Sequence, residues 1–499
     1  MKALNKISNL LNLRWLMPVS GGVVIAFASA FILRQSLVWS GLVVVGLTVG
    51  LLSLMAKDFR TYWLAIYALV LPLDIKKLLV DSEYLRATMQ LHGMTIGELP
   101  APVLYLCDMP LFVLMGVWIY DIVLKKQKII FPKSNWMALA FLAWGALSSI
   151  NTTVLSYTFF DLIKWFKLYL LYLYVANNIR SRETVRVLVF CLLLGVIVQA
   201  LFCVYQYVSQ DITPIFGNLF GKSELFTESG ALKNQRLWDV SESGNFGLKR
   251  ASGTIGHSNS QARYFEFLLP VALILYLKSS RFRNRAFLLM TLILGLLGLI
   301  VTFSRGGFIG LAVGFTIIIL LARWVKLISG RKFFALTVIG LAITIVFIPF
   351  IADHILTRPQ STLARLYLSW IGFDMIKQNP ILGGGLNNHM ILKSEFDLNI
   401  HGFYFYPVHN YFLIIATEVG IPGLAFFLGF LTLTFMLAYR AAHNEDVYLA
   451  AIAIGIFGAL AAVSFHALVY VFPSYIILHF LWLFAGLAAA LNTMNLKSS

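Results

Sequence analysis

Long apolar segments separated by polar connections recur along the whole chain. Most of them are close to the length of about 20 residues that an α-helix needs to cross a bilayer. Because backbone groups in lipid must find their hydrogen-bond partners within the segment, we expect these segments to be helices. A membrane β-barrel would show short segments of alternating hydrophobicity instead. The pattern predicts an all-α integral membrane protein with about 12–14 transmembrane helices.

The boundaries of these segments follow from the change between apolar and polar residues. The predicted spans are residues 17–32, 37–55, 62–73, 102–124, 136–150, 159–176, 185–208, 262–277, 286–303, 306–322, 333–351, 410–439, 447–470 and 474–491. The first is expected to be a retained span, because no small-residue cleavage pattern follows it.

Composition agrees with a membrane protein and excludes a soluble fold of this length, since 59% of the 499 residues are hydrophobic and 12% are charged. The net charge of +17 does not indicate nucleic-acid binding, because the basic residues are spread between the apolar segments. Cys107, Cys191 and Cys203 lie in or beside apolar segments without CxxC spacing. The sequence therefore supports neither a disulfide framework nor a zinc site.

The distribution of charge predicts which connections face which side. Alternate connections are short and rich in lysine and arginine, which places them and the N-terminus in the cytoplasm. The others include residues 74–101, 209–261 and 352–409, which are longer, carry most of the histidines and are expected to face outward. No repeat or linker marks a second domain, so residues 1–499 are interpreted as one membrane domain with external loops at 209–261 and 352–409.

The loop at 352–409 is predicted to form a folded lid over an external cavity. Residues 361–379 have apolar side chains at helical spacing, which is typical of an amphipathic helix at the membrane interface. Those apolar positions are Leu363, Leu366, Trp370, Ile371 and Met375. Pro380 ends this helix, and three glycines at 383–385 then allow a tight backbone path.

Two arginines beside predicted spans are candidates for binding an anionic ligand. Arg305 lies between two spans with almost no loop, so it should face the outer interface or a water-filled cavity, and Gly306 and Gly307 favour space for a ligand beside it. Arg250 opens a segment, 250–259, whose Gly, Ser, Thr and Asn residues suit phosphate oxygens. The alternatives are an arginine that extends to lipid headgroups and an ordinary polar loop.

His409 and Glu418 are candidates for chemistry where the long loop re-enters the membrane. An imidazole with an ordinary pKa of about 6.5 suits proton transfer at neutral pH, although a lone histidine often only caps a helix. Glu418 lies inside the same apolar segment, where an acidic group is either functional or paired with an arginine. His466 and His479 lie in or near the last two spans and are expected to be packing residues.

A metal site is not expected among the external residues. His257, His389 and His401 have spacing that fits no zinc motif. Glu395 and Asp397 form an acidic pair that can bind a divalent cation, but a solvated loop is the better interpretation. The sequence contains no Walker loop, GxSxG elbow or HExxH motif, which argues against an ATPase, a serine hydrolase or a zincin.

Four ordered elements between residues 250 and 423 carry a family resemblance. They are Arg250 through Asn259, Ser304 through Gly307, Arg365 through Gly385, and His409-Asn410-Tyr411 followed by Glu418-Val419-Gly420. In this order and spacing the sequence resembles the O-antigen ligase and polymerase superfamily of bacterial envelope-glycan enzymes.

The resemblance implies a GT-C-like membrane glycosyltransferase of the bacterial inner membrane, with no metal or other cofactor. Such an enzyme moves a glycan from undecaprenyl pyrophosphate to an acceptor hydroxyl at the periplasmic face, with inversion. The resemblance places Arg250, Arg305 and Arg365 on the pyrophosphate and makes Arg305 and His409 catalytic, with His409 at the reacting hydroxyl. The supporting residues that it implies are Asn259, His257, Asn410 and Glu418.

Two questions stay open at the level of sequence. A ligase uses a lipid A core sugar as the acceptor, whereas an O-antigen or exopolysaccharide polymerase uses another lipid-linked repeat, and both need the same catalytic groups. A secondary transporter is the alternative from another class, because Glu418 beside Gly420 and Pro422 is typical of the broken helices that bind solutes. The charged candidates gather on one external face instead of at the midplane, which favours the enzyme.

Overall fold

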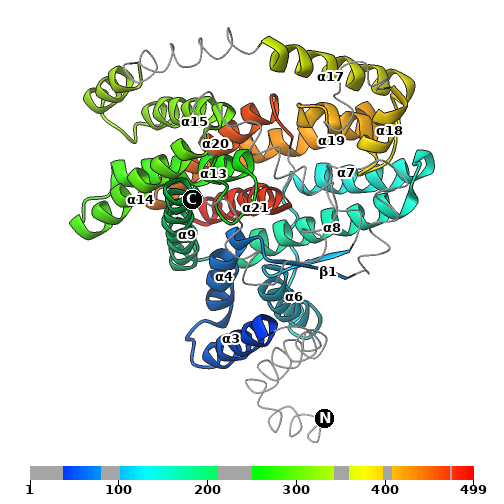
Figure 1. The fold of residues 1–499 in the computed structure, drawn as a ribbon. Helices are drawn as coiled ribbons and strands as arrows, with labels where there is room; N and C mark the ends of the chain where they lie inside the picture. Colours follow the sequence, from blue (N-terminus) through cyan, green and yellow to red (C-terminus); the bar gives the residue numbers. More distant parts are fainter. Residues whose placement is uncertain are drawn as a thin grey trace, which may run out of the picture.

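The computed structural model describes residues 37–79, 102–210, 250–341, 359–396, 407–471 and 475–498. Helices make up nearly all of these ranges (Figure 1). The predicted span at 17–32, most of the loop at 209–261 and the second half of the span at 333–351 lie outside the described residues, as do His401 and Asp397.

Each predicted span within the described ranges coincides with a helix, which confirms the all-α membrane fold. The helices are α3 Leu37–Ser53, α4 Phe59–Val70, α6 Asp108–Val123, α7 Asn135–Leu147, α8 Leu155–Asn178, α9 Arg182–Ser209, α13 Ser258–Lys278, α14 Phe282–Val301, α15 Arg305–Trp324, α17 Pro359–Gln378, α18 His389–Phe396, α19 Tyr411–Ala441, α20 Val447–Ala467 and α21 Tyr475–Ser498, with 3-10 turns η1 Leu71–Leu73 and η2 Ser148–Asn151. Within the described part of the chain, 6 helices are long and apolar enough to cross a membrane, namely α9, α14, α15, α19, α20 and α21. The total of about 12–14 spans stays a prediction.

Small residues bring α15 and α20 close together. A side-chain carbon at Gly314 would lie 2.8 Å from the carbonyl oxygen of Gly458, and one at Gly458 would overlap Ile318. Such glycines let two membrane helices approach closely enough for their backbones to pack. The close approach sets the start of α15, which carries Arg305, beside the end of α20, which carries His466.

A short antiparallel ribbon, which the sequence did not predict, precedes α6. Strand β1, Lys76–Leu78, pairs with β2, Val103–Tyr105, so that Lys76 lies opposite Tyr105. The predicted span at 102–124 therefore begins as a strand, and its helix starts only at Asp108. Apolar residues of β2 and of a helix cannot be told apart by hydrophobicity alone in so short a segment.

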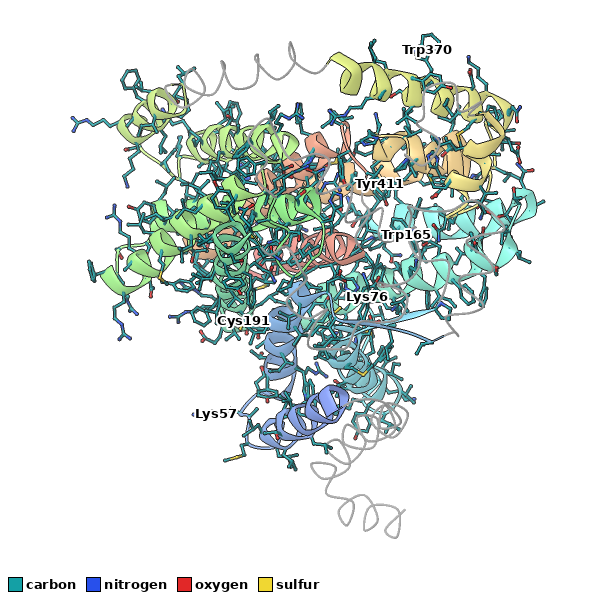
Figure 2. All side chains as sticks on the ribbon, viewed as in Figure 1. Lys57, Lys76, Trp165, Cys191, Trp370 and Tyr411 are labelled. Atoms are coloured by element: carbon teal, nitrogen blue, oxygen red, sulfur yellow. The ribbon has the colours of Figure 1, made fainter. Side chains whose placement is uncertain are left out.

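Helix α17 is present as predicted, but it does not have the single apolar face that the sequence suggested. Ile371 and Met375 are buried with Leu368 against α18, whereas Leu363, Leu366 and Trp370 are exposed. Trp370 projects away from the rest of the structure (Figure 2). The apolar residues thus divide between a face that packs on the protein and a face that points outward.

Helix α19 is kinked at Gly420, as the glycines and the proline in this segment predicted. Gly420 has a φ of 70°, and a side-chain carbon there would overlap the carbonyl oxygen of Ile381. The kink leaves the carbonyl groups of Thr417 and Glu418 without helical partners. The backbone N–H groups of Gly384 and Gly385 donate to them, at 2.9 Å each. Gly384 and Gly385 therefore close the gap in a broken helix.

Candidate functional site

Arg250 is fixed against the turn that precedes α15. Its Nε donates to the carbonyl oxygen of Thr302 at 2.9 Å, and its Nη2 donates to Oδ1 of Asn259 at 2.7 Å. The backbone N–H of Ala251 donates to the carbonyl oxygen of Val301 at 2.9 Å. The structure thus joins the predicted pair Arg250 and Asn259, and it holds both next to the start of α15.

The backbone after Arg250 is held by two glutamines of α9 that the sequence did not indicate. Oε1 of Gln206 accepts from the N–H groups of Ser252 and Gly253 at 3.0 and 2.8 Å. Oε1 of Gln199 accepts from the N–H of Thr254 at 3.1 Å. These backbone donors are therefore engaged within the protein. In this segment the guanidinium group of Arg250, not the loop backbone, is the group suited to an anion.

Arg305 is the first residue of α15, and Ser304 is the N-cap of this helix. The Gly307 N–H donates a hydrogen bond of 3.3 Å to Ser304 Oγ. A helix N-terminus is the positive end of the helix dipole, so it adds to the attraction that an arginine has for an anion. The sequence predicted space for a ligand at Gly306. The structure contradicts this, because a side-chain carbon there would overlap the ring of His466. Gly306 instead brings Arg305 beside that histidine.

Tyr470, just beyond the end of α20, lies at the centre of a cluster of cationic and histidine side chains. We call this group, together with two further arginines whose charges act on its histidines, the Arg–His cluster; its members are Arg250, His257, Arg263, Arg365, His409, His466 and Tyr470. The Tyr470 ring centroid lies 5.5 Å from that of His257 and 5.9 Å from those of His409 and His466. The Arg263 guanidinium lies 4.8 Å from the same centroid, which is a cation–π distance.

Arginine charges act on two histidines of this cluster. Burial lowers the pKa of His257 to about 3, and the charges of Arg250, Arg263 and His409 act in the same direction. His257 is therefore neutral at physiological pH. Arg365 of α17, together with Arg250 and Arg263, is close enough to His466 for its charge to act on that ring. Residues from α13, α17 and α20 thus share one positive environment.

His257 connects Tyr470 to the N-terminus of α13. As the N-cap residue, it accepts a hydrogen bond from the Asn259 N–H on Nδ1 at 3.2 Å. The proton of the neutral ring must then lie on Nε2, which is 2.8 Å from Oη of Tyr470. His257 therefore donates to Tyr470 and orients its hydroxyl group.

His409 lies at the border of the cluster with its ring orientation set by its own backbone. Nδ1 is 2.9 Å from the carbonyl oxygen of Pro407, and because a carbonyl only accepts, Nδ1 carries the hydrogen. In the neutral ring the lone pair is then on Nε2. That is the arrangement which a general base requires, with one nitrogen anchored and the other able to take a proton.

His389 holds the backbone directly before His409. The N–H of Val408 donates to Nε2 of His389 at 3.3 Å, while Nδ1 lies 2.7 Å from Oγ1 of Thr417. Thr417 Oγ1 in turn donates to the carbonyl oxygen of Ile414 at 2.8 Å. Burial lowers the pKa of His389 to about 3, so the ring stays neutral and keeps Nε2 as an acceptor. The sequence pattern indicated His389 only as a possible metal ligand and did not predict its hydrogen bond with Val408.

His466 of the cluster forms a buried pair with Glu266 of α13. Nδ1 of His466 and Oε1 of Glu266 are 2.8 Å apart and fully enclosed. Arg263, one turn before Glu266, donates to the carbonyl oxygen of Val471. The sequence could have indicated Arg263 and Glu266, because charged residues inside a predicted span are functional candidates by default.

The two remaining predicted residues have structural contacts. Asn410 caps α19, and its Oδ1 accepts from the N–H groups of Phe412 and Leu413 at 3.0 and 3.2 Å. Glu418 lies two residues before the kink in α19, and its backbone carbonyl accepts from the Gly385 N–H. Both residues are therefore part of the scaffold that carries His409.

Two comparisons with known proteins found similar sequences. Residues 289–428 match the family model described as O-antigen ligase. A protein of Rickettsia typhi, named as a candidate polysaccharide ligase, is 27% identical over 307 residues, which cover 58% of this chain and 65% of that protein. The matched residues include Arg305, Arg365 and His409, of which His409 lies beside Tyr470. Over this region the chain is similar to the O-antigen ligase family, in agreement with the resemblance that its motifs carry.

Proposed function

We propose that this protein is a metal-independent, inverting glycosyltransferase of the bacterial inner membrane. It moves a glycan from undecaprenyl pyrophosphate to an acceptor hydroxyl at the periplasmic face. Its N-terminus lies on the opposite, cytoplasmic side of the membrane. The O-antigen ligase match supports glycan transfer in general. The observation that carries the proposal is that His409 and Arg263 lie beside Tyr470. The charges of Arg250, Arg263 and Arg365 act on the neighbouring histidines His257 and His466.

The arginines account for binding of the donor and for departure of the leaving group. Arg250, Arg305 and Arg365 offer planar forks of N–H donors that match phosphate oxygens and stay charged at any physiological pH. As the bond between the anomeric carbon and the pyrophosphate oxygen breaks, negative charge builds on the diphosphate. Fixed cationic donors stabilise that charge in the transition state. Since they supply the counter-charge, the donor needs no metal ion.

His409 accounts for activation of the acceptor. Its Nε2 takes the proton of the acceptor hydroxyl while the hydroxyl oxygen forms a bond to the anomeric carbon on the face opposite the pyrophosphate. A single displacement of this kind inverts the anomeric centre. The hydrogen bond from Nδ1 to the Pro407 carbonyl keeps the lone pair on Nε2 and stabilises the imidazolium that forms.

The test is reconstitution of the full chain with lipid-linked repeat units, with and without lipid A core, followed by sizing of the glycan. Loss of transfer by about 10²–10⁴-fold is expected for His409→Ala, which is the usual contribution of a general base. His443→Ala is the matched control, because this histidine lies on an exposed turn after α19. Full activity of His409→Ala would overturn the proposal.

The same assay separates the two acceptor classes. A ladder of products made without the core indicates a polymerase of O-antigen or exopolysaccharide, and a single transfer that requires the core indicates a ligase. Transfer should not depend on added Mg²⁺ or Mn²⁺, since the arginines neutralise the diphosphate. A requirement for either ion would remove the metal-independent mechanism.

The secondary transporter is the alternative that the kink in α19 favours. In broken transporter helices, the freed carbonyl groups coordinate the substrate ion. Here those of Thr417 and Glu418 accept hydrogen bonds from Gly384 and Gly385. This arrangement weighs against ion binding at the kink and in favour of the enzyme. Solute uptake into vesicles that depends on Glu418 and not on His409 would reverse this preference.

A further inference from the structure

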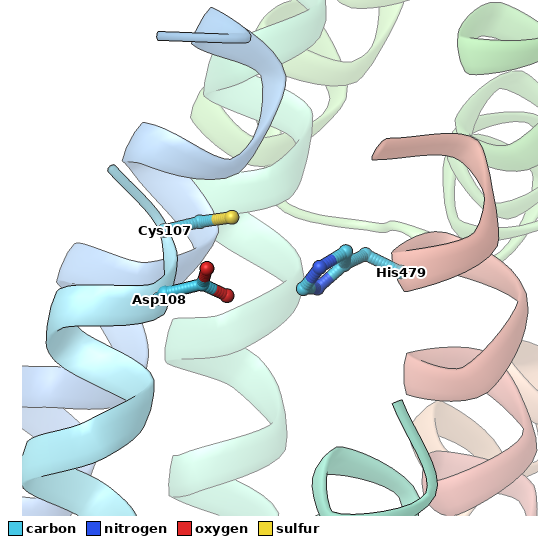
Figure 3. Close-up of side chains that lie close together, drawn as sticks. All are labelled: Cys107, Asp108 and His479. Carbon is cyan, nitrogen blue, oxygen red and sulfur yellow. The ribbon is translucent and has the colours of Figure 1, made fainter. Parts of the chain in front are cut away.

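Three side chains from distant parts of the sequence meet where the start of α6 approaches α21. They are Cys107, Asp108 and His479 (Figure 3). One ligand atom from each lies within 4.8 Å of the others. All three residues are buried, with 1%, 0% and 0% of their surface exposed. This group, which we call the Cys–Asp–His cluster, consists of residues other than those of the Arg–His cluster.

Two of the inward-facing atoms have no hydrogen-bond partner in the part of the chain that the structure describes. They are Oδ1 of Asp108 and Nε2 of His479. Buried polar atoms are nearly always satisfied, and each exception calls for an explanation such as an ion bound to it. Figure 3 shows the carboxylate and the imidazole directed towards each other from opposite helices.

The other atoms of these side chains are held by neighbours. Oδ2 of Asp108 accepts from Lys167 Nζ at 2.7 Å and from the Tyr105 N–H at 3.0 Å. Nδ1 of His479 lies 2.8 Å from Oη of Tyr67. Ligands in metal sites are commonly oriented in this way by a second hydrogen bond on the atom that does not bind the metal.

We propose that the Cys–Asp–His cluster binds a zinc ion. A thiolate, an imidazole and a carboxylate suit Zn²⁺, whereas Mg²⁺ and Ca²⁺ prefer oxygen ligands alone. Ligand atoms about 2.0–2.3 Å from a tetrahedral ion lie about 3.3–3.8 Å apart, so small inward movements of the side chains complete the site. On binding, the Cys107 thiol loses its proton to solvent and the sulfur bonds to zinc.

The charges of the site indicate its fourth ligand. The thiolate and the carboxylate balance Zn²⁺, and Lys167 adds one positive charge through its ion pair with Asp108. A hydroxide as the fourth ligand makes the whole group neutral. The ion joins α6 to α21, while Tyr67 of α4 and Lys167 of α8 contact the ligands. The site is independent of the proposed glycan transfer, so the two are tested separately.

The experiment uses the purified full chain in detergent with Co²⁺ as a spectroscopic probe for zinc. We expect one ion per chain, an absorption band from thiolate-to-cobalt charge transfer, and loss of the band when Zn²⁺ is added. Cys107→Ser should abolish the band. Cys203→Ser, which changes another buried cysteine on α9, is the matched control and should keep it. His479→Gln should weaken zinc binding by at least tenfold.

A second variant keeps the test decisive if Cys107→Ser does not fold. The sequence contains 3 cysteines, so the double variant Cys191→Ser/Cys203→Ser leaves Cys107 as the sole thiol. It should retain the full cobalt band. Tyr67→Phe should lower zinc affinity by about 10–100-fold, the usual effect of removing a group that orients a ligand. Absence of the band in the wild-type protein, or its loss in the double variant, would overturn the zinc site.

Discussion

Arg250 donates a hydrogen bond of 2.9 Å to the carbonyl oxygen of Thr302, three residues before Arg305. This contact brings the Arg250 guanidinium beside the turn that leads into α15, whose first residue is Arg305. Arg305 itself is fixed by the start of α15, whose first turn is packed against α20. The Arg250 guanidinium and the backbone of Arg305 are therefore both held by contacts within the protein.

Arg305→Ala is expected to lower kcat/KM for glycan transfer by about 10²–10³-fold, as for removal of one donor to a developing negative charge. Arg305→Lys should also be impaired, because a point charge does not replace a planar fork. Transfer kinetics of the reconstituted protein measure both effects. Arg323→Ala, at the other end of the same helix and exposed, should behave as wild type.

His389→Ala should reduce kcat for transfer by about tenfold or more with little change in KM, because it releases the backbone before His409 without touching either substrate. His389→Gln should recover part of the loss, since a side-chain carbonyl can accept from the Val408 N–H. A purely structural role for His389 would instead lower the amount of folded protein and leave kcat per folded molecule unchanged.

The same histidine should make stability depend on pH. The pKa of His389 is about 3 in the folded protein and near 6.5 when the chain is unfolded, so the unfolded state binds more protons below pH 6.5. Its contribution to stability is therefore present above about pH 6.5 and is lost as the pH falls towards 3. Thermal unfolding in detergent between pH 7 and 4 should show a smaller fall in Tm for His389→Gln than for the wild type.

Tyr470→Phe removes the hydroxyl that His257 contacts at 2.8 Å but keeps the ring beside His409 and Arg263. We expect a loss of transfer of about tenfold, in line with one buried hydrogen bond of about 1–1.5 kcal/mol. Tyr470→Ala should be more severe, because it also removes the ring from the Arg–His cluster. Equal effects of the two substitutions would indicate that only the hydroxyl matters.

Gly420→Ala should destabilise the protein by about 1–3 kcal/mol or more, since a side chain at this φ is strained and would also overlap Ile381. The measurement is the midpoint of thermal unfolding in detergent. Gly116→Ala is the control, because a side-chain carbon at this helical position meets nothing within 4 Å. Alanine favours helix over glycine, so the control should be neutral or slightly stabilising. An equal response of both variants would contradict the role of the kink.

Several features of the candidate site followed from local sequence. The kink at Gly420 could be predicted because glycine and proline act on their own backbone. The positions of Arg250, Arg305 and His409 beside spans followed from where apolar segments end. The apolar face of α17 was predicted wrongly, because helical spacing does not say how many sides of a helix the fold will cover.

The sequence by itself determined which segments are helices and which of them are apolar enough to lie in a membrane, because length and hydrophobicity are properties of each segment alone. Only the tertiary structure decided that Tyr470 lies among His257, His409 and Arg263, and that Cys107 faces His479 from another helix. These neighbours are far apart in the chain. What brings them together is the packing of whole helices, through close contacts such as that between Gly314 and Gly458. The sequence pattern of one segment does not determine which surface of another segment it will contact.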